Sequence, residues 1–231
     1  MNMKNILTIV IPCKNESELI VETLYHLNRQ EFISGVKVII ADASDDNTRE
    51  VINDVEYENI DIHIIDGGIP SVARNNGAKL VETPYVLFMD ADMILSDRYT
   101  IFDTIVNIDD YDLVTCKFRT EGKYSFIFPI FEFLRDLVVW YSPCAIGGYM
   151  LFRKSVFDEL GGFNEEFLVA EDYALSNQIK PCRFKVSDKI IYTTDRRFRK
   201  KGLWYMAKLM ILSVINKNNP KFFKDSHGYW I

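Results

Sequence analysis

The sequence predicts an α/β fold in which helices flank a mostly parallel central sheet. In the first ninety residues, short β-branched segments alternate with segments whose apolar residues have helical spacing. Alternation of this kind gives parallel strands joined by right-handed crossovers. The 231 residues are 48% hydrophobic, which is enough for one large core or two fused lobes. Because no repeat or low-complexity linker divides the chain, we expect a single compact unit over residues 1–231.

The strands expected in this first part are short runs rich in branched apolar residues. The run LTIVIP ends at a proline, and the run YVLFM leads directly into two aspartates. The four strand candidates are residues 7–12, 36–41, 60–65 and 85–89.

Helix candidates occupy the segments between these strands. The first has an apolar stripe that includes Ile20, Leu24 and Leu27, and the second opens on Asn47 and Glu50, which have capping-box spacing. The third begins at a proline, which suits the first helical turn. The three helix candidates are residues 16–27, 48–55 and 70–81.

The second half of the chain has fewer regular signals. Residues 113–118 and 149–152 have the composition of strands, and the second of these follows a glycine pair. A helix is expected over residues 154–160, and the following Gly161 and Gly162 end it. Another helix is expected to begin near Glu171.

Polar or glycine-rich loops follow all four strand candidates of the first half. In parallel sheets, ligands bind at the carboxyl ends of the strands. The fourth loop contains Asp90 and Asp92, whose carboxylates would repel each other and resist desolvation, so an oxygen-seeking divalent cation is a natural partner. A cation held by one or two protein carboxylates keeps sites free for substrate phosphates. The alternative is that both aspartates only cap a turn, but the convergence of four polar loops favours a binding site.

Composition excludes several classes of protein. The formal net charge of −6 argues against a nucleic-acid binder, which normally carries a basic surplus. The four cysteines are far apart and form no Cys-x-x-Cys pair, which argues against a zinc site or a disulfide framework and favours a reducing cytosol. No apolar stretch is long enough to span a bilayer, and the N-terminal run ends too early for a signal peptide. We therefore expect a cytoplasmic protein.

The order of motifs resembles glycosyltransferase family 2. The resemblance covers roughly residues 6–200, and each motif alone is weak, whereas six in the family's usual order are specific. The matching segments are TIVIPCKNE at 8–16, DASDDNT at 42–48, ARNNG at 73–77, DAD at 90–92, MLFRKSVF at 150–157 with GGF at 161–163, and EDY at 171–173. The resemblance implies a GT-A fold, which is Rossmann-like, and inverting transfer of a sugar from a nucleoside-diphosphate sugar with Mn²⁺ or Mg²⁺. It further implies a nucleotide-sugar-binding half at about 1–95, an acceptor half at about 96–195 and a basic C-terminal tail at 196–231.

The resemblance assigns the nucleoside to the first two loops. Pro12 and Glu16 would lie along the nucleoside, and Asp42 sits where the family uses an acid to recognise the base. A carboxylate there can accept a hydrogen bond from uracil, so uridine is favoured. The chain departs from the commoner Asp-Asp-Gly-Ser pattern because Ala41 and Ala43 flank Asp42, which leaves guanosine open.

The resemblance assigns the diphosphate and the metal to the following motifs. Asp92 matches the direct metal ligand, and Asp90 is closer to the ribose or bound to the metal through water. Arg74 matches an arginine near the donor; the alternative is a solvated helix residue. Gly148, with its neighbour Gly147, would let the backbone approach the donor sugar; the alternative is a plain turn.

An inverting transfer needs a base on the acceptor side, because the acceptor hydroxyl loses its proton as it attacks. The family's acidic pair matches Glu171 and Asp172, and we assign the base to Asp172, with Glu171 as the alternate. The alternative is that both acids interact only with the dipole of the helix that they begin.

The C-terminal tail is strongly basic. Between Arg196 and Lys224 there are nine Lys or Arg residues and no Asp or Glu, which points to an anionic partner. Arg196 and Arg197 open a basic segment that some short family members carry; it could bind the diphosphate or a lipid phosphate, or be only a solvated turn. The apolar residues 203–215 and the aromatic residues 124–141 could lie in a membrane interface or pack in the core. A peripheral enzyme on the cytosolic membrane face, with a lipid-linked acceptor, is the resulting hypothesis.

Other functions fit less well. A nucleotide-sugar pyrophosphorylase needs a Gly-rich basic loop after the first strand, and a Rossmann dehydrogenase needs Gly-x-Gly-x-x-Gly; the sequence has neither. The family's Gln-x-x-Arg-Trp element is also missing, which argues against a processive polysaccharide synthase. The remaining alternative is a non-catalytic binder of nucleotide sugars or membranes.

Overall fold

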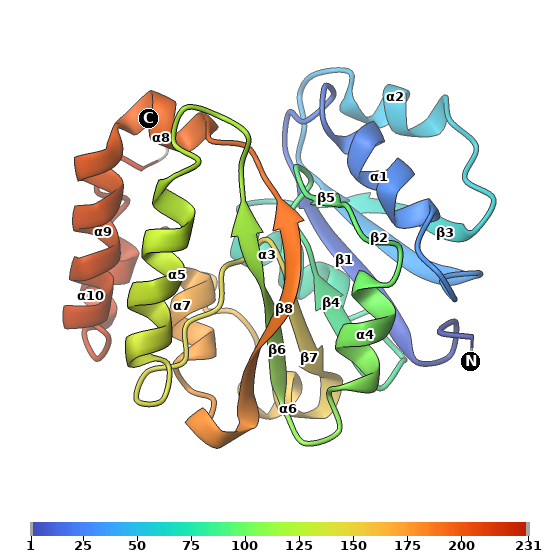
Figure 1. Cartoon of the computed structure of the whole chain (residues 1–231). Helices are drawn as coiled ribbons and strands as arrows, with labels where there is room; N and C mark the ends of the chain where they lie inside the picture. The colour runs from blue at the N-terminus through green and yellow to red at the C-terminus, as the bar shows by residue number, and fades with distance from the viewer. Residues whose placement is uncertain (1, 230–231) are drawn as a thin grey trace.

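The computed structural model describes residues 2–229. Within them, the strands form one mixed sheet of eight strands in the order β3-β2-β1-β4-β7-β6-β8-β5 (Figure 1). The strands are β1 (Leu7–Cys13), β2 (Val36–Asp42), β3 (Ile60–Asp66), β4 (Tyr85–Phe88), β5 (Ile94–Leu95), β6 (Leu113–Arg119), β7 (Met150–Arg153) and β8 (Phe184–Tyr192). The α/β prediction is confirmed.

The first four strands are parallel, as the alternation of strands and helices predicts. β1 pairs with β2 on one side and β4 on the other, and β2 pairs with β3. The crossovers between them contain α1 (Ile20–Asn28), α2 (Thr48–Asn53) and α3 (Pro70–Ala78). The carboxyl ends of all four strands therefore meet at one edge. Antiparallel pairing is confined to the second half, where β7 pairs with β4 and β6, and β5 pairs with β8.

The core forms on both faces of the sheet because successive strand residues point to opposite faces. On β1, Ile9 and Ile11 belong to a cluster with residues of α1, α4 and α5, whereas Val10 belongs to a second cluster with residues of α3, α6 and α7. The remaining helices are α4 (Thr100–Val106), α5 (Ile127–Val138), α6 (Lys154–Glu159), α7 (Glu171–Ser176), α8 (Arg196–Lys201), α9 (Leu203–Ile215) and α10 (Pro220–Lys224), with a 3₁₀ turn at Pro181–Arg183.

Three helix boundaries differ from the expectation. α1 begins at Ile20 rather than at residue 16, because the Glu16 carbonyl accepts from the Leu19 and Ile20 N–H groups in a preceding turn. α2 and α3 end at Asn53 and Ala78, earlier than expected. The expected capping box is wrong: Asn47 makes no side-chain cap, and Asp46 instead accepts from the Thr48 N–H at 3.0 Å.

Several elements of the second half carry no clear pattern in the sequence. β8 alternates poorly because Lys185, Asp188 and Lys189 interrupt its apolar residues, and its register against β6 shifts between Thr115 and Lys117. α5 occupies the centre of the aromatic segment 124–141, and α9 has the bounds of the apolar segment 203–215. Among the described residues, no helix is long and apolar enough to cross a membrane.

Candidate active site

The loops after β1 and β2 are joined by hydrogen bonds at the carboxyl edge of the sheet. The Asn15 N–H donates to Ser44 Oγ at 2.8 Å, and the Glu16 N–H donates to Thr48 Oγ1 at 3.1 Å. Asn15 adopts a φ of 54°, in the left-handed region that asparagine tolerates better than most residues. Two of the four predicted loops are therefore held together at one place.

The Asp90-Ala91-Asp92 segment leaves β4 at the same edge. Ala91 and Met93 are buried in the core, and the Ala91 carbonyl accepts from Thr23 Oγ1 of α1 at 2.8 Å. The two aspartates alternate with these buried residues, and their side chains are 27% and 17% exposed. Thr23 thus fixes the backbone between two carboxylates that remain accessible to solvent.

Arg74 is buried between two carboxylates from distant parts of the chain. Its Nη2 donates to Asp90 Oδ1 and its Nη1 to Glu171 Oε1, both at 2.7 Å. Its guanidinium also lies 5.3 Å from the centre of the Phe163 ring. The alternative of a solvated helix residue is wrong, because the side chain is 3% exposed. Arg74 therefore connects the Asp-x-Asp segment to the acidic pair of α7.

Asp172 lies beside this arginine at the start of α7. Its Oδ2 accepts from the Gly147 N–H and its Oδ1 from the Tyr173 N–H, both at 2.7 Å. Burial, and then the charge of Glu171, raise the pKa of Asp172 to about 6, although Arg74 opposes the rise. A carboxyl group with this pKa is ionised near neutral pH and is still basic enough to accept a proton.

The backbone around Asp172 is adapted to this arrangement. Ala170, which precedes α7, has a left-handed φ of 49°, a conformation that costs energy for a residue with a side chain. A Cβ atom at Gly147 would lie 2.6 Å from Arg74 Nη2 and 3.4 Å from Asp172 Oδ2. Gly147 is thus the glycine that this cluster requires. A Cβ atom at Gly148, the predicted donor contact, would lie 2.9 Å from Met93 Sδ and 2.9 Å from Phe118 Cε1.

Arg196 binds the carboxylates on the other side of the Asp-x-Asp segment. Its Nη2 lies 2.7 and 2.8 Å from the two oxygens of Glu16 and 3.4 Å from Asp92 Oδ2. Thr194 Oγ1 donates to the same Asp92 oxygen at 3.0 Å. Burial raises the pKa of Glu16, and burial together with Asp90 raises that of Asp92; Arg196 lowers both. Glu16 and Asp92 therefore share one positive charge, which is the guanidinium of Arg196.

Arg197 follows on the same helix and interacts with the C-terminal segment. Its guanidinium lies 4.9 Å from the centre of the Tyr229 ring and donates to the Tyr229 hydroxyl. It also interacts electrostatically with Asp90 and Asp92. The first turn of α8 thus places two cations, Arg196 and Arg197, beside the Asp-x-Asp segment.

The predicted nucleoside residues lie at the ends of β1 and β2. Pro12 pairs with Ala41 in the sheet. Asp42 is buried, and its carboxylate accepts from Arg49 Nε at 2.6 Å and from the Ser44 N–H at 3.2 Å. The Asp42 side chain is 0% exposed in this structure, so a contact with a nucleobase requires neighbouring side chains such as Arg49 or Ser44 to move.

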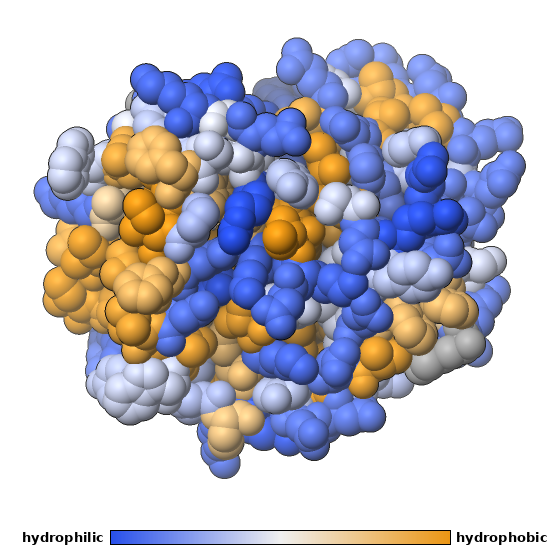
Figure 2. Space-filling model, viewed as in Figure 1, coloured by the Kyte–Doolittle hydropathy of each residue, from blue (hydrophilic) through white to orange (hydrophobic). Residues whose placement is uncertain are grey.

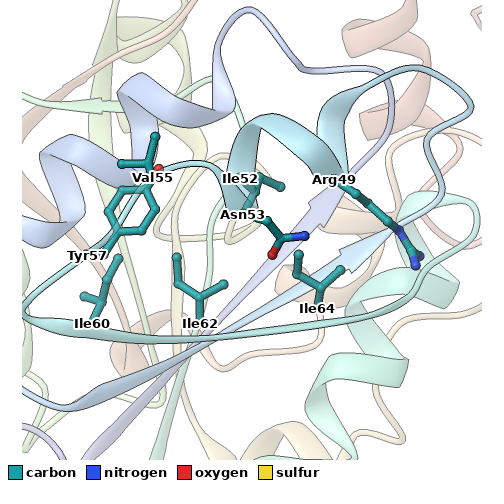
Figure 3. Close-up of a pocket in the computed structure, with 8 residues that line it drawn as sticks. All are labelled: Arg49, Ile52, Asn53, Val55, Tyr57, Ile60, Ile62 and Ile64. Atoms are coloured by element: carbon teal, nitrogen blue, oxygen red, sulfur yellow. The ribbon is translucent and has the colours of Figure 1, made fainter.

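A groove lined by several aliphatic residues lies next to this region, apart from the carboxylates Glu16, Asp90, Asp92, Glu171 and Asp172, which we call the acidic cluster. The groove has a volume of about 430 Å³ and lies between α2 and one face of the edge strand β3. Figure 3 shows Ile60, Ile62 and Ile64 pointing toward Ile52 of α2, whereas the Arg49 guanidinium points away from them. The groove contains none of the predicted site residues, and a charged ligand has few partners in it. We therefore place the candidate site at the acidic cluster.

The acidic cluster has the ligand chemistry that Mn²⁺ or Mg²⁺ prefers. Among residues 2–229, no three His, Cys, Asp or Glu side chains are grouped so that they could hold a metal ion by themselves. A cation that takes most of its ligands from water and substrate phosphates needs only one or two protein carboxylates. Asp92 and Glu16 already hold a guanidinium, which shows that their oxygens can converge on one positive charge.

Sequence reasoning missed several residues of this site. Thr23 binds the Ala91 carbonyl between the two aspartates, Thr194 donates to Asp92, and Arg49 donates to Asp42. The contacts of Thr23 and Thr194 join residues far apart in the chain. No motif in the sequence marks either threonine as part of the site. Arg49 follows the DASDDNT motif directly, so a search for cations beside that motif would have found it.

Comparisons with known proteins show which proteins this chain is similar to. A family model described as glycosyl transferase family 2 matches residues 8–161. A poly-β-1,6-N-acetyl-D-glucosamine synthase from Staphylococcus epidermidis is 27% identical over 187 residues, which cover 74% of this chain and 44% of the synthase. The corresponding Staphylococcus aureus synthase is also 27% identical, over 184 residues with the same coverage. The chain thus spans less than half the length of these curated relatives.

Solved structures show the same fold at lower identity. A Pyrobaculum calidifontis mannosyltransferase in complex with GDP-Man and Mn²⁺ has a TM-score of 0.66 and 18% identity, over 96% of this chain and 68% of its own. S. aureus TarS in complex with UDP-GlcNAc has a TM-score of 0.66 and 22% identity, over 90% and 66%. Mycobacterium tuberculosis glucosyl-3-phosphoglycerate synthase with Mn²⁺, UDP-glucose and phosphoglyceric acid has a TM-score of 0.62 and 14% identity, over 92% and 79%.

Proposed function

The chain belongs to glycosyl transferase family 2 and has the GT-A fold, and from this premise we propose that it transfers a sugar from a nucleoside-diphosphate sugar to an acceptor hydroxyl or phosphate, with inversion. One observation carries the proposal. The buried Arg74 joins Asp90, on the proposed donor side, to Glu171, the neighbour of the proposed base. This connection puts both halves of a displacement reaction around a single buried cation.

The donor diphosphate is proposed to lie between the Asp-x-Asp segment and the start of α8. Asp92, assisted by Asp90, would hold Mn²⁺ or Mg²⁺, and the bound ion would supply positive charge for the departing diphosphate. Arg196 and Arg197 are the cations proposed to face the phosphates, because both interact with the Asp-x-Asp segment and guanidinium groups suit phosphate oxygens. In this proposal, Arg196 exchanges the carboxylates of Glu16 and Asp92 for phosphate oxygens when the donor binds.

Asp172 is proposed to take the proton from the attacking acceptor. Its two backbone hydrogen bonds fix the orientation of the carboxylate and leave lone pairs open for an acceptor hydroxyl. The raised pKa of about 6 suits a base that works near neutral pH. Glu171 is held by Arg74 at 2.7 Å and would act by position and charge.

UDP is the proposed nucleotide, as in the TarS and M. tuberculosis complexes, although the mannosyltransferase complex contains GDP-Man. A panel of nucleotide sugars with Mn²⁺ or Mg²⁺ tests this choice and the metal together. A donor present at about 100 times its Kd adds about 2.7 kcal/mol to the unfolding free energy, which raises Tm by several degrees for a domain of this size. We expect one UDP-sugar with metal to give this shift.

The same measurement on Asp92→Asn checks the metal ligand. This variant should lose the metal-dependent part of the shift, because a neutral amide is a weaker ligand than a carboxylate for a hard cation. Asp188→Asn, which changes an exposed carboxylate paired with Lys117, is the matched control. The proposal fails if every nucleotide sugar shifts Tm equally in EDTA and in Mn²⁺.

Arg196→Ala tests the exchange of carboxylates for phosphates. Loss of a charge-assisted hydrogen bond, about 1.5–3 kcal/mol, should raise KM for the donor about 10–100-fold. Tm should change little because Arg196 is 50% exposed. Arg199→Ala is the control, since it removes a cation from the same helix that pairs with Asp195. If Arg196 only shields the acidic cluster, the variant will bind Mn²⁺ more tightly and leave the donor KM unchanged.

The acceptor is proposed to be lipid-linked, and the enzyme to work at the cytosolic face of a membrane with peripheral contact through residues 124–141 and 203–215. The four cysteines are free thiols, which is compatible with a reducing compartment. The exposed apolar side chains of α5 and α9 support the membrane part of this proposal. An assay that measures consumption of the donor can compare sugar transfer to water-soluble alcohols with transfer to amphiphilic alcohols.

A further inference from the structure

Helix α5 has an apolar exposed side. It buries Glu132 and Arg135 together with Ile127 and Phe128, and Phe133 on its outer side is 64% exposed. Specific contacts hold this orientation. Glu132 Oε1 accepts from the Phe118 N–H at 2.7 Å, and Glu132 Oε2 lies 2.6 Å from Arg119 Nη1. The apolar outer side is therefore set by polar anchors on β6.

Helix α9 also presents apolar residues to solvent. It buries Leu209 and Ser213, whereas Trp204 is 86% exposed and Ile215 is 72% exposed. Trp204, Ile211 and Ile215 recur at spacings that place them on one side of a helix, and Lys208 lies in the same row. This helix thus offers an apolar stripe with a cation in it.

The two helices form one continuous surface. The Lys217 Nζ, just after α9, lies 4.1 Å from the centre of the Tyr141 ring, just after α5. The helices run side by side in Figure 1, and Figure 2 shows hydrophobic side chains gathered over them. We call this surface the α5–α9 face; its main exposed members are Phe133, Leu137, Trp140, Trp204, Ile211 and Ile215. Such a large exposed apolar patch marks an interaction surface.

The charge around the α5–α9 face is positive. The segment from Arg196 to Lys224 contains nine Lys or Arg residues and no acid, and Lys208 and Lys217 lie within or beside the face. On α5 the exposed acid is Asp136, which is 3.2 Å from Arg135 Nε. An apolar surface with a basic border and exposed Trp residues is complementary to an anionic lipid interface.

We propose that the α5–α9 face docks on the surface of a bilayer that contains anionic lipid. A second copy of the chain is a poorer occupant, because a two-fold interface would bring the same cations together. The face is also connected to the active site through α8. Phe198 packs against Phe128 and Phe131 of the aromatic segment, while Arg196 of the same helix binds Glu16. This inference rests on the peripheral membrane contact of the proposed function and deepens it, because it names the lipid chemistry that recruits the enzyme.

Vesicle sedimentation of the 231-residue protein, without donor or metal, tests this proposal separately from catalysis. We expect the protein to pellet with vesicles of phosphatidylcholine and phosphatidylglycerol, and much less with phosphatidylcholine alone. Binding should weaken at about 1 M salt, where the Debye length is about 3 Å. Protein that stays in the supernatant with anionic vesicles at low salt overturns the proposal and leaves the proposed sugar transfer standing.

Two pairs of variants locate the docking surface. Phe133→Ser with Ile211→Ser should reduce vesicle affinity by a factor on the order of ten or more, because each loses exposed apolar area that the bilayer would cover. Tyr99→Ser with Val106→Ser is the matched control, since both residues are exposed apolar residues beside or on α4. Lys208→Glu with Lys217→Glu should reduce affinity on anionic vesicles by a similar factor, and Lys79→Glu with Lys180→Glu, at two other exposed lysines, should not.

Light scattering distinguishes a lipid surface from self-association. A monomer in solution whose vesicle binding is lost in the face variants, but not in the controls, supports the proposal. A stable dimer that the Phe133→Ser and Ile211→Ser changes convert to a monomer overturns it and assigns the face to a second copy. Equal vesicle binding by face variants and control variants also overturns it. Phe133, Ile211, Tyr99 and Val106 are exposed, so their substitution should change Tm little, and the Tm of every variant is measured.

Discussion

Asp172→Asn is expected to lower kcat by about 10²–10⁴-fold, which is the usual contribution of a positioned general base. Asparagine has nearly the same shape, so the fold and the donor site should persist. It keeps one oxygen that can accept from the Gly147 or the Tyr173 N–H, and it removes a buried charge. Calorimetry with the donor nucleotide and Mn²⁺ should therefore give an unchanged Kd while transfer is lost.

The pH dependence of the wild-type enzyme provides an independent readout of the same residue. Because the base must be ionised and the pKa of Asp172 is raised to about 6, kcat/KM should rise about tenfold per pH unit below pH 6 and level off above it. Protonation below this pKa favours the folded state relative to the unfolded one, so the loss of activity in mild acid should occur without unfolding. Two results would exclude Asp172 as the base. One is near-normal transfer by Asp172→Asn, and the other is a decrease of kcat/KM below pH 6 that is the same in this variant as in the wild type.

The placement of Asp90 and Asp92 could be predicted from sequence because it depends on local rules. A buried apolar strand is followed by Asp90-Ala91-Asp92, so these aspartates must lie beyond the end of the strand, where the chain reaches solvent. Parallel strands bring such ends to one edge of the sheet. The same rule predicts the loops after β1 and β2. Both predictions need only the residues of one segment and the direction of its neighbours.

The contacts inside the site could not be predicted because they join distant segments. Nothing near Arg74 in the sequence indicates that it is buried, because its neighbours Asn75 and Asn76 are polar. One of the two carboxylates that pair with it, Glu171, is 97 residues away in the chain. The orientation of α5 was hidden for a similar reason. A helical pattern shows two faces, but the Phe118 N–H on β6 decides that the face with Glu132 lies inside.

Arg74→Met is expected to be the most destabilising single change in the site. It leaves the carboxylates of Asp90 and Glu171, and the nearby Asp172, without their buried counter-charge. Removal of one partner from a buried ion network costs about 3–5 kcal/mol, which corresponds to a fall in Tm on the order of 10 °C for a domain of this size. Arg98→Met, which removes an exposed arginine paired with Glu31 at 2.9 Å, should cost under about 1 kcal/mol.

The cost of Arg74→Met should depend on pH in a defined direction. Arg74 opposes the rise in the pKa of Asp172, so without the arginine the folded-state pKa of Asp172 should rise further, and its protonation at low pH should relieve the repulsion. Stability is then lost as pH increases through this raised pKa, and the deficit relative to wild type should be larger at pH 8 than at pH 5. Adding Glu171→Gln should recover part of the loss, because it removes one uncompensated charge. Equal losses for Arg74→Met and Arg98→Met, at either pH, would show that the Arg74 network does not hold the two halves of the site together.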